Sequence, residues 1–313
     1  MSRVHDALRR AEQLASTPGS AADAPAAQSS APPPVHAANG AGTSNTTAAA
    51  VIAPSSLGVG PDLLRRVREV PFSPAKDAHI IDITRPHDAP AEEFRTLRTR
   101  LNHLQTQQAL RTLVITSPSP AEGKSFAAVN LAIAESQLDG NNTLLIDCDF
   151  RRPIAHSLFQ FDRSPGMTEF LQGKAELHEC IRRIQGTNLF VIPAGEAVVN
   201  PLELLNRVEM KHLTEQLPRV FNWVFLDSPP LLFAADANLL STISSGTVLV
   251  VRIGATTIDS VTRAMQSLCE NNVLGIIVNG ARRGELYSKY TYYHSYYYAE
   301  PEPEPDKEAE PGA

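Results

Sequence analysis

Short apolar runs alternate with segments of helical periodicity through most of the chain after residue 78. The runs are continuous rather than alternating, as in strands that are buried on both faces of a parallel sheet. Strand and helix alternate over roughly 200 residues, which predicts one doubly wound, mainly parallel α/β domain of the phosphate-loop NTPase type. The predicted strands are Thr112–Thr116, Thr143–Asp147, Leu189–Ile192, Trp223–Asp227, Thr247–Arg252 and Leu274–Val278, with helices around 93–108, 124–138, 201–217 and 257–271.

The two ends of the chain lack this alternation. Residues 1–15 place Val4, Ala7, Leu8, Ala11 and Leu14 at spacings of three or four, which predicts a short amphipathic helix. It is either a frayed terminus or a docking helix for a partner or a membrane surface. The stretch that follows is rich in Ala, Pro, Ser and Gly and cannot bury enough apolar surface to offset its ordering entropy. We therefore place a disordered linker at 16–77, the folded domain at 78–285, and a disordered tail at 286–313.

Composition and charge limit the classes of partner and the cellular compartment that we expect for the protein. The 313 residues carry a formal charge of −6, and most of it lies in the acidic segment after Ala299, so the body is close to neutral. A neutral body argues against nucleic acid as a partner. The three cysteines fit no disulfide or metal pattern, and no apolar run approaches the roughly 20 residues that a membrane span needs. We expect a protein of the cytoplasm.

A phosphate loop is the first chemical signal. Gly123-Lys124-Ser125 lies between a predicted strand and a predicted helix, where loop N–H groups and the positive end of the helix dipole bind phosphates. Lys124 would reach the β and γ phosphates of ATP, and the Ser125 hydroxyl would bind Mg²⁺. The usual first glycine of such loops is replaced by Pro118, so an ordinary strand-to-helix turn with a capping serine remains the alternative. The residues expected to bind nucleotide are Pro120, Ala121, Glu122, Gly123, Lys124, Ser125, Phe126, Arg152 and Asn279.

Three acidic residues stand at the ends of two predicted strands. Asp147 and Asp149 follow the run TLLI, and Asp227 ends the run WVFLD. The carboxyl ends of parallel strands are where ligands bind in such sheets, and a spacing of two puts Asp147 and Asp149 on the same side. Together with the loop lysine, these carboxylates predict a site for Mg²⁺ and ATP.

The tyrosines are confined to one short segment near the end of the chain. Between residues 287 and 298 lie all seven of them: Tyr287, Tyr290, Tyr292, Tyr293, Tyr296, Tyr297 and Tyr298. A sticky adhesive or membrane-interface segment is the alternative to a cluster of phosphate acceptors.

The ordered set of motifs resembles the bacterial protein-tyrosine kinases of capsule and exopolysaccharide synthesis. The likeness covers about residues 78–298 and rests on EEFRTLRTRL, TSPSPAEGKS, LLIDCDFRRP, FLDSPP and the tyrosine cluster. It implies an ATP-dependent tyrosine autokinase that phosphorylates its own tail in trans and regulates polysaccharide polymerisation and export. It also implies that Lys124, Asp147 and Asp149 are catalytic and that Ser125, Asp149 and Asp227 hold the metal. Asp147 would activate the tyrosine hydroxyl, although its role and that of Asp149 could be exchanged.

The resemblance further implies partners. Glu92, Arg95 and Arg98 would join subunits into a ring, whereas without the family they describe a solvated helix face with ion pairs. Many relatives are fused to a transmembrane segment. The absence of one here indicates the split form, which meets the inner membrane through a separate membrane-embedded co-polymerase or chain-length determinant that activates it. A cognate tyrosine phosphatase is expected as well.

The sequence differs from the family pattern at one position of the phosphate loop, and two other functions remain as alternatives. The family usually has glycine at the position of Ala121, and if that position needs positive φ, alanine costs about 1 kcal/mol. The first rival is a partitioning-type ATPase, which would carry a lysine at the position of Ser119. The second is an adaptor that binds nucleotide without transferring phosphate. Kinases of the eukaryotic type are disfavoured because their H-R-D and D-F-G elements are missing.

Overall fold

The computed structural model describes residues 57–60, 62–75, 79–82, 90–268 and 273–281. The chain divides into the units Met1–Leu57 and Gly58–Ala313, and every element below lies in the second. The predicted N-terminal helix, most of the linker and the whole tyrosine segment lie outside the described residues.

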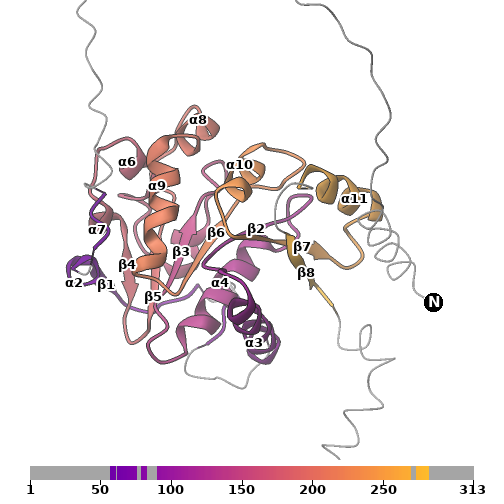
Figure 1. Ribbon diagram of the computed structural model, residues 1–313, viewed down its shortest axis with the longest axis horizontal. Coiled ribbons are helices and arrows are strands. Elements are labelled where there is room, and N and C mark those ends of the chain that lie inside the picture. The colour runs from indigo at the N-terminus through magenta and orange to yellow at the C-terminus, as the bar shows by residue number, and fades with distance from the viewer. Residues whose placement is uncertain (1–56, 61, 76–78, 83–89, 269–272, 282–313) are drawn as a thin grey trace, which may run out of the picture. The chain divides into compact units, whose positions relative to one another are not determined.

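One eight-stranded sheet forms the centre of this unit (Figure 1). The strands occur in the order β1-β4-β5-β3-β6-β2-β7-β8. All neighbours pair in parallel except β4 and β5, so the prediction of a mainly parallel sheet is confirmed. The strands are β1 (Arg68–Val70), β2 (Thr112–Thr116), β3 (Thr143–Asp147), β4 (Arg182–Ile184), β5 (Leu189–Ile192), β6 (Trp223–Asp227), β7 (Gly246–Arg252) and β8 (Val273–Asn279).

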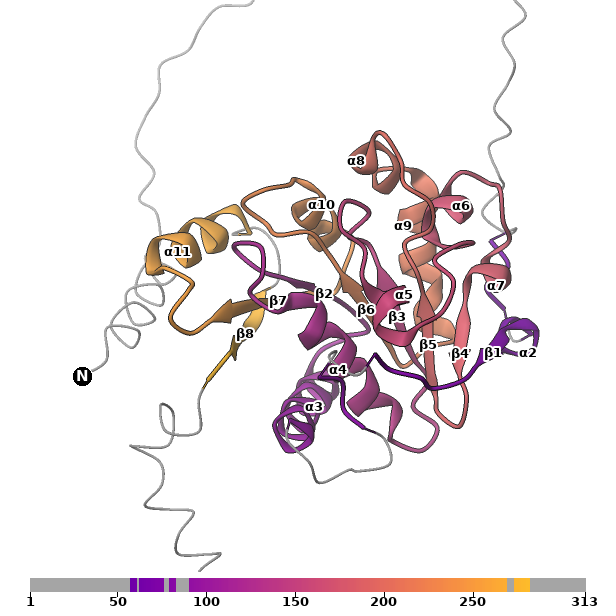
Figure 2. The same ribbon diagram turned by 180° about the vertical axis from the view of Figure 1, so that it is seen from behind.

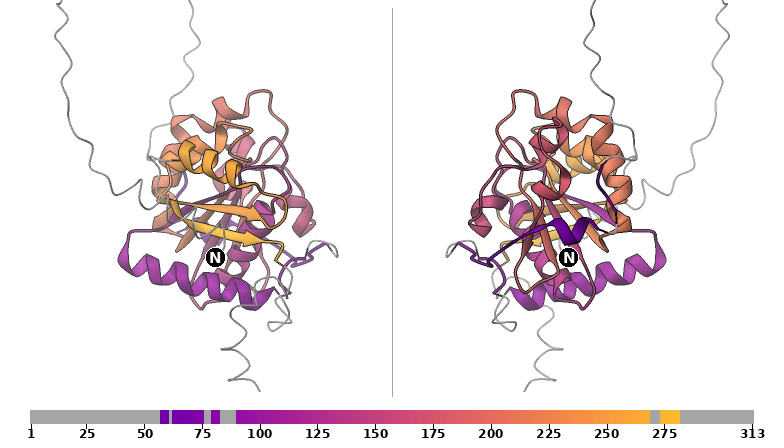
Figure 3. Two further views of the ribbon diagram at one scale, coloured as in Figure 1. Left: turned by 90° about the vertical axis from the view of Figure 1, so that its right-hand side faces the viewer. Right: turned by 90° about the vertical axis from the view of Figure 1, so that its left-hand side faces the viewer.

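Helices cover both faces of the sheet, as the doubly wound prediction requires (Figure 3). On one face α4 (Lys124–Ser136) packs on the central strands, and α3 (Ala91–Gln107) packs on α4. On the other face α11 (Ile258–Ser267) packs on β7 through Ala264 and Leu268. The remaining helices are α2 (Leu63–Arg66), α5 (Ala155–Phe159), α6 (Met167–Leu171), α7 (Leu177–Cys180), α8 (Pro201–Leu205), α9 (Val208–Gln216) and α10 (Asp236–Thr242), with a 3₁₀ turn at Leu217–Arg219.

Two sequence predictions need correction. The linker does not extend to residue 77, because α2 and β1 already belong to the fold and β1 pairs with β4 at the sheet edge seen in Figure 2. These elements are too short and too charged to show an apolar period. The single helix predicted at 201–217 is two helices, because Arg207 takes an extended conformation with ψ at 150°.

A buried polar cluster joins α3 to α4. The Glu135 side chain on α4 is fully buried, and its Oε2 accepts from Asn102 Nδ2 at 3.0 Å and from Asn141 Nδ2 at 2.9 Å. Asn102 accepts in turn from Trp223 Nε1 at 3.0 Å. Burial raises the pKa of Glu135 to about 7, against the opposing effect of the two amides and Arg98.

No helix in the described ranges is long and apolar enough to cross a bilayer.

Candidate active site

The phosphate loop connects β2 to α4 and leaves backbone donors free at the start of the helix. Gly123 caps α4 with φ at 96°, and a Cβ there would lie 1.9 Å from Nδ2 of Asn279, so only glycine fits. The first helical bond in α4 runs from Ala127 N to Gly123 O. The N–H groups of Lys124, Ser125 and Phe126 therefore have no acceptor within the helix, and they point where an anion is stabilised by the helix dipole.

Ala121 adopts the left-handed conformation that the sequence comparison anticipates. Its φ is +62°, a region that alanine enters at a cost of about 1 kcal/mol relative to glycine. The loop keeps this conformation although it lacks the family's glycine.

Contacts from distant segments hold the loop in place. The buried Glu122 carboxylate accepts from Ser119 N at 2.8 Å and from the Thr256 hydroxyl at 2.5 Å. Arg252 donates to the carbonyl of Ala121, and Asn279 Nδ2 donates to the carbonyl of Glu122 at 3.0 Å. These contacts fix the loop conformation. Nothing in the sequence marks Arg252 or Thr256 for this role, because they lie about 130 positions from the loop.

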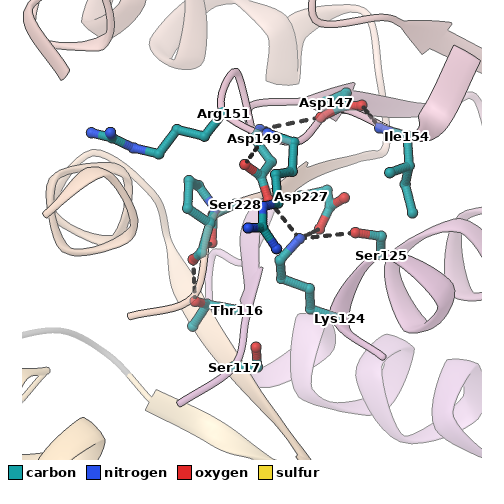
Figure 4. A network of polar contacts seen from close by, with 12 residues as sticks. Thr116, Ser117, Lys124, Ser125, Asp147, Asp149, Arg151, Ile154, Asp227 and Ser228 are labelled. Atoms are coloured by element: carbon teal, nitrogen blue, oxygen red, sulfur yellow. Dashed lines mark hydrogen bonds and ion pairs between the residues drawn. The ribbon is translucent and has the colours of Figure 1, made fainter. Parts of the chain in front are cut away.

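Lys124 meets the carboxylates of Asp149 and Asp227 at the start of α4 (Figure 4). The Lys124 ammonium lies 2.8 Å from Asp149 Oδ2 and 3.7 Å from Asp227 Oδ1. It also lies 3.0 Å from the Ser125 hydroxyl oxygen. All four side chains are buried or nearly so, and Lys124 itself is 12% exposed. The sequence prediction that these groups converge is confirmed.

Asp147 lies beside this cluster but is held differently. It pairs with Asp227 across β3 and β6, and its residue is fully buried. Its Oδ2 accepts from the backbone N–H groups of Ile154 and Ala155, each at 3.0 Å, and its Oδ1 accepts from Asp149 N at 3.2 Å. Asp147 therefore orders the loop that follows β3 as well as facing the cluster.

The carboxylates and the lysine shift one another's proton affinity. Burial and then the nearby Asp227 raise the pKa of Asp147 to about 7, although backbone hydrogen bonds oppose this. Burial also raises the pKa of Asp227, while Lys124 opposes it. For Lys124, burial lowers the pKa, but Asp227 and Asp149 outweigh it and hold the value above the ordinary one. The ammonium is thus charged at neutral pH, and the Asp147 carboxyl group binds a proton more readily than an ordinary aspartate.

The donor set fits a magnesium ion that is shared with phosphates. Asp227 Oδ1 is buried and has no hydrogen-bond partner among the described residues, so it has a lone pair available for a cation. No group of three or more His, Cys, Asp or Glu side chains in the described part of the chain could hold a metal alone. Mg²⁺ commonly takes one or two carboxylates plus phosphate oxygens and water, so Ser125, Asp149 and Asp227 suit that mode.

The other predicted nucleotide contacts lie around the loop. Pro120 and Ala121 are exposed at its tip, and Arg152 is exposed beyond Asp149, whose Oδ1 accepts from the Arg152 N–H. The Phe126 side chain packs edge-on against Phe94, so only its backbone can face a ligand. Asn279 contacts the loop backbone, and its predicted contact with the nucleotide stays a prediction.

The predicted interface residues lie along α3. Arg95 pairs with Glu92 one turn earlier. Arg98 donates to the carbonyl of Ala134 at 2.8 Å, near the end of α4. Within one chain these contacts match a helix face with local ion pairs, and the role in a ring stays a prediction.

An ion pair that sequence reasoning missed braces the loop after β3. Arg151 Nε lies 2.6 Å from Oδ2 of Asp236, the first residue of α10, whose side chain is fully buried. The pair ties the Asp149 loop to the segment that follows Asp227. The sequence offers no signal for it, because the partners are 85 positions apart.

The comparisons with known proteins agree with this site. The chain is 34% identical over 217 residues to the tyrosine-protein kinase YwqD of Bacillus subtilis, covering 69% of this chain and 91% of that protein. It is 31% identical over 228 residues to the tyrosine-protein kinase wzc of Salmonella typhimurium, covering 72% of this chain and 32% of that protein. It thus spans about a third of the second relative. No family model matches the sequence.

A solved structure shares the fold. The kinase domain of the Escherichia coli tyrosine kinase ETK superposes with a TM-score of 0.63 at 31% identity, covering 72% of this chain and 95% of that one. This shared fold is the phosphate-loop NTPase architecture that the sequence predicts.

Proposed function

The chain belongs to the bacterial tyrosine-protein kinases, and from that premise we propose that it transfers the γ-phosphate of ATP to the tyrosines of its own tail. The observation that carries the proposal is the contact of Lys124 with Asp149 and Asp227 at the start of α4. The acceptors would be the seven tyrosines between residues 287 and 298.

The residues of the loop would bind and orient the nucleotide. The N–H groups of Lys124, Ser125 and Phe126 and the dipole of α4 favour phosphate oxygens. Lys124 would leave Asp149 for the β and γ phosphates, where its charge is most stabilising as the bond to the leaving oxygen lengthens. Ser125, Asp149 and Asp227 would hold Mg²⁺, which neutralises charge on the same oxygens.

A carboxylate would take the proton of the attacking tyrosine. The tyrosine oxygen forms a bond to the γ phosphorus, the bond from that phosphorus to the β–γ bridging oxygen breaks, and the hydroxyl proton moves to the base. Asp147 suits this role because its pKa near 7 lies at the working pH. Asp149 is the alternative, since its Oδ2 lies 2.8 Å from the Lys124 ammonium.

The tail would also control assembly. Each phosphate adds roughly −1.5 to −2 charges, so several would make a strongly anionic segment beside the acidic end of the chain. We expect such a tail to repel the carboxylate-lined site and to loosen a ring held through Glu92, Arg95 and Arg98. In this account, transfer occurs in trans, and cycles of assembly regulate polysaccharide polymerisation and export through a membrane-embedded co-polymerase and a tyrosine phosphatase.

The fate of the γ-phosphate tests the reaction. The purified chain is incubated with Mg²⁺ and ATP labelled on the γ-phosphate, and label on protein and label released as inorganic phosphate are both measured. A kinase places label on tyrosine. Release of phosphate without protein label would favour the partitioning-type ATPase, and nucleotide binding without either product would favour the adaptor.

A further inference from the structure

An exposed aromatic residue stands on the loop that follows the metal-site strand. Residues 228–235 join β6 to α10, and within them Leu232 is 38% exposed and Phe233 is 68% exposed. Among the large apolar side chains that are exposed in the described ranges, Phe233 is the only aromatic one. Exposed apolar groups that cluster next to a site commonly mark a binding surface.

The loop is held firmly to the phosphate loop. The N–H of Leu231 donates to Ser117 O at 2.8 Å, and the N–H of Leu232 donates to Pro118 O at 3.3 Å. The Thr116 hydroxyl donates to Pro229 O at 3.0 Å. These three hydrogen bonds hold the backbone of residues 229–232 against the strand and loop that precede α4. The exposed Phe233 follows directly after this anchored backbone.

The ion pair between Arg151 and Asp236 fixes the far end of the same loop. Asp236 lies three positions after Phe233 and begins α10, and its carboxylate is fully buried under Arg151. The segment carrying Phe233 is thus bound at one end to the phosphate loop and at the other to the Asp149 loop. We call Leu232 and Phe233 the apolar ledge.

The chain itself contains a segment that matches the ledge. Residues 287–298 hold seven tyrosines, one lysine and no acid, and the described fold contains no tyrosine. Aromatic rings pack edge-to-face or offset against one another, which suits a tyrosine on Phe233.

The described chain ends at the end of the sheet that carries the site, so the tail of each copy begins there. Strands β6, β2, β7 and β8 are parallel neighbours, so Asn279 ends β8 at the same sheet edge as Asp227. Three strand spacings place β8 about 14 Å from β6, and Asn279 lies four residues beyond the position level with Asp227, so the two residues are about 19 Å apart. Eight residues lead from Asn279 to Tyr287 and span up to about 26 Å when extended.

We propose that the apolar ledge is the surface on which the tyrosine segment of a second copy of this chain docks, with one ring packed on Phe233 while another tyrosine enters the site. This inference rests on the proposed function and deepens it, because it assigns acceptor recognition to residues 232 and 233. Several rings of the cluster can use one ledge in turn, so the ledge selects an aromatic-rich segment rather than one position.

The test places the same substitution in either partner of a transfer reaction. The donor is the full chain with all seven tail tyrosines changed to phenylalanine, and the acceptor is the full chain with Lys124→Met and an intact tail. Phosphotyrosine on the acceptor is measured as initial rate against acceptor concentration. Phe233→Ala in the donor should lower the rate at limiting acceptor by about tenfold or more, with unchanged affinity for ATP.

The controls separate docking from other roles. Phe233→Ala in the acceptor should have no effect, and Phe233→Tyr in the donor should retain transfer. Val208→Ala, which alters an exposed apolar side chain on α9, should leave the donor unchanged. A donor variant that transfers as well as its parent would overturn the ledge. Equal loss from substitution in donor and acceptor would also overturn it, because that pattern belongs to a subunit contact.

Failure of the proposed function gives a different result. If the unsubstituted donor transfers no phosphate to the acceptor, the kinase proposal falls and the ledge falls with it. If transfer is robust but indifferent to Phe233, only the ledge is wrong.

Discussion

The ammonium of Lys124 lies 2.8 Å from Asp149 Oδ2, in a cluster whose other buried members are Asp147 and Asp227. One cation thus faces three carboxylates. The arrangement keeps the lysine charged and the carboxylates close together. Mg²⁺ would complement the charge of the carboxylates, and phosphates would complement the charge of the lysine.

Removal of that cation should destabilise the empty protein. Lys124→Met leaves the carboxylates without a partner, and we expect the free energy of unfolding to fall by about 2–4 kcal/mol near pH 8. The loss should shrink toward pH 5, because carboxylates without the lysine have raised pKa values and become neutral as pH falls. Urea unfolding at both pH values measures this, with the exposed Lys211→Met as the control. A loss that is equal at both pH values would contradict the electrostatic cause.

Ala121 should respond favourably to glycine. Its φ of +62° is strained for alanine, so Ala121→Gly should raise the free energy of unfolding by up to about 1 kcal/mol and should not weaken ATP binding. Thermal or urea unfolding checks the first part, and calorimetric titration with nucleotide checks the second. Ala109→Gly, at an exposed position without positive φ, should be neutral or destabilising. The same change in stability at both positions would show that strain at residue 121 is not the cause.

Glu135 should make stability depend on pH. Its pKa is about 7 in the folded protein against 4.5 ordinarily, so the folded state holds an extra proton between these values and stability falls as pH rises through them. The loss of folding stability is complete above about pH 7 and amounts to on the order of 3 kcal/mol at most. Glu135→Gln keeps an oxygen for Asn102 and Asn141 and should abolish this part of the slope. Parallel slopes for parent and variant would be inconsistent with a buried proton, and the exposed Glu93→Gln should leave the slope unchanged.

Negative charge on the tail should prevent assembly. A chain with all seven tail tyrosines replaced by glutamate should remain a monomer in light scattering, because the tail then repels the carboxylate-lined site and neighbouring tails. The matched chain with seven phenylalanines keeps the aromatic rings without the charge and should assemble like the unphosphorylated parent. A stable ring from the glutamate variant would contradict the proposed control of assembly.

The central strands could be predicted because strands buried on both faces of a sheet appear in the sequence as continuous apolar runs. The predicted bounds of β2, β3, β5 and β6 coincide with the observed ones, and the groups at their carboxyl ends converge as expected. Parallel topology places Asp147 and Asp227 side by side once each strand is identified. This is why Lys124, Ser125 and the three carboxylates could be assigned to one site from the sequence.

Short elements and long-range contacts could not be predicted in the same way. Strands β1 and β4 have three residues each, too few to show a period, and the break at Arg207 depends on one backbone angle. The pair Arg151–Asp236 and the contact of Thr256 with Glu122 join residues that are far apart in the chain. Their partners are defined only by the folded arrangement. The exposure of Phe233 could not be predicted for a related reason. An apolar residue next to a buried strand is expected in the core, and only the structure shows that this side chain is exposed.

The most direct test of the account maps phosphate on the tail in cells. The full chain, its Lys124→Met variant and its Asp149→Asn variant are expressed at matched levels, with folding checked by circular dichroism, and phosphorylation is mapped by mass spectrometry. We predict phosphotyrosine between Tyr287 and Tyr298 in the parent and none in either folded variant. Phosphotyrosine that persists in the variants, or its absence from a parent supplied with a membrane partner, would contradict autophosphorylation at this site.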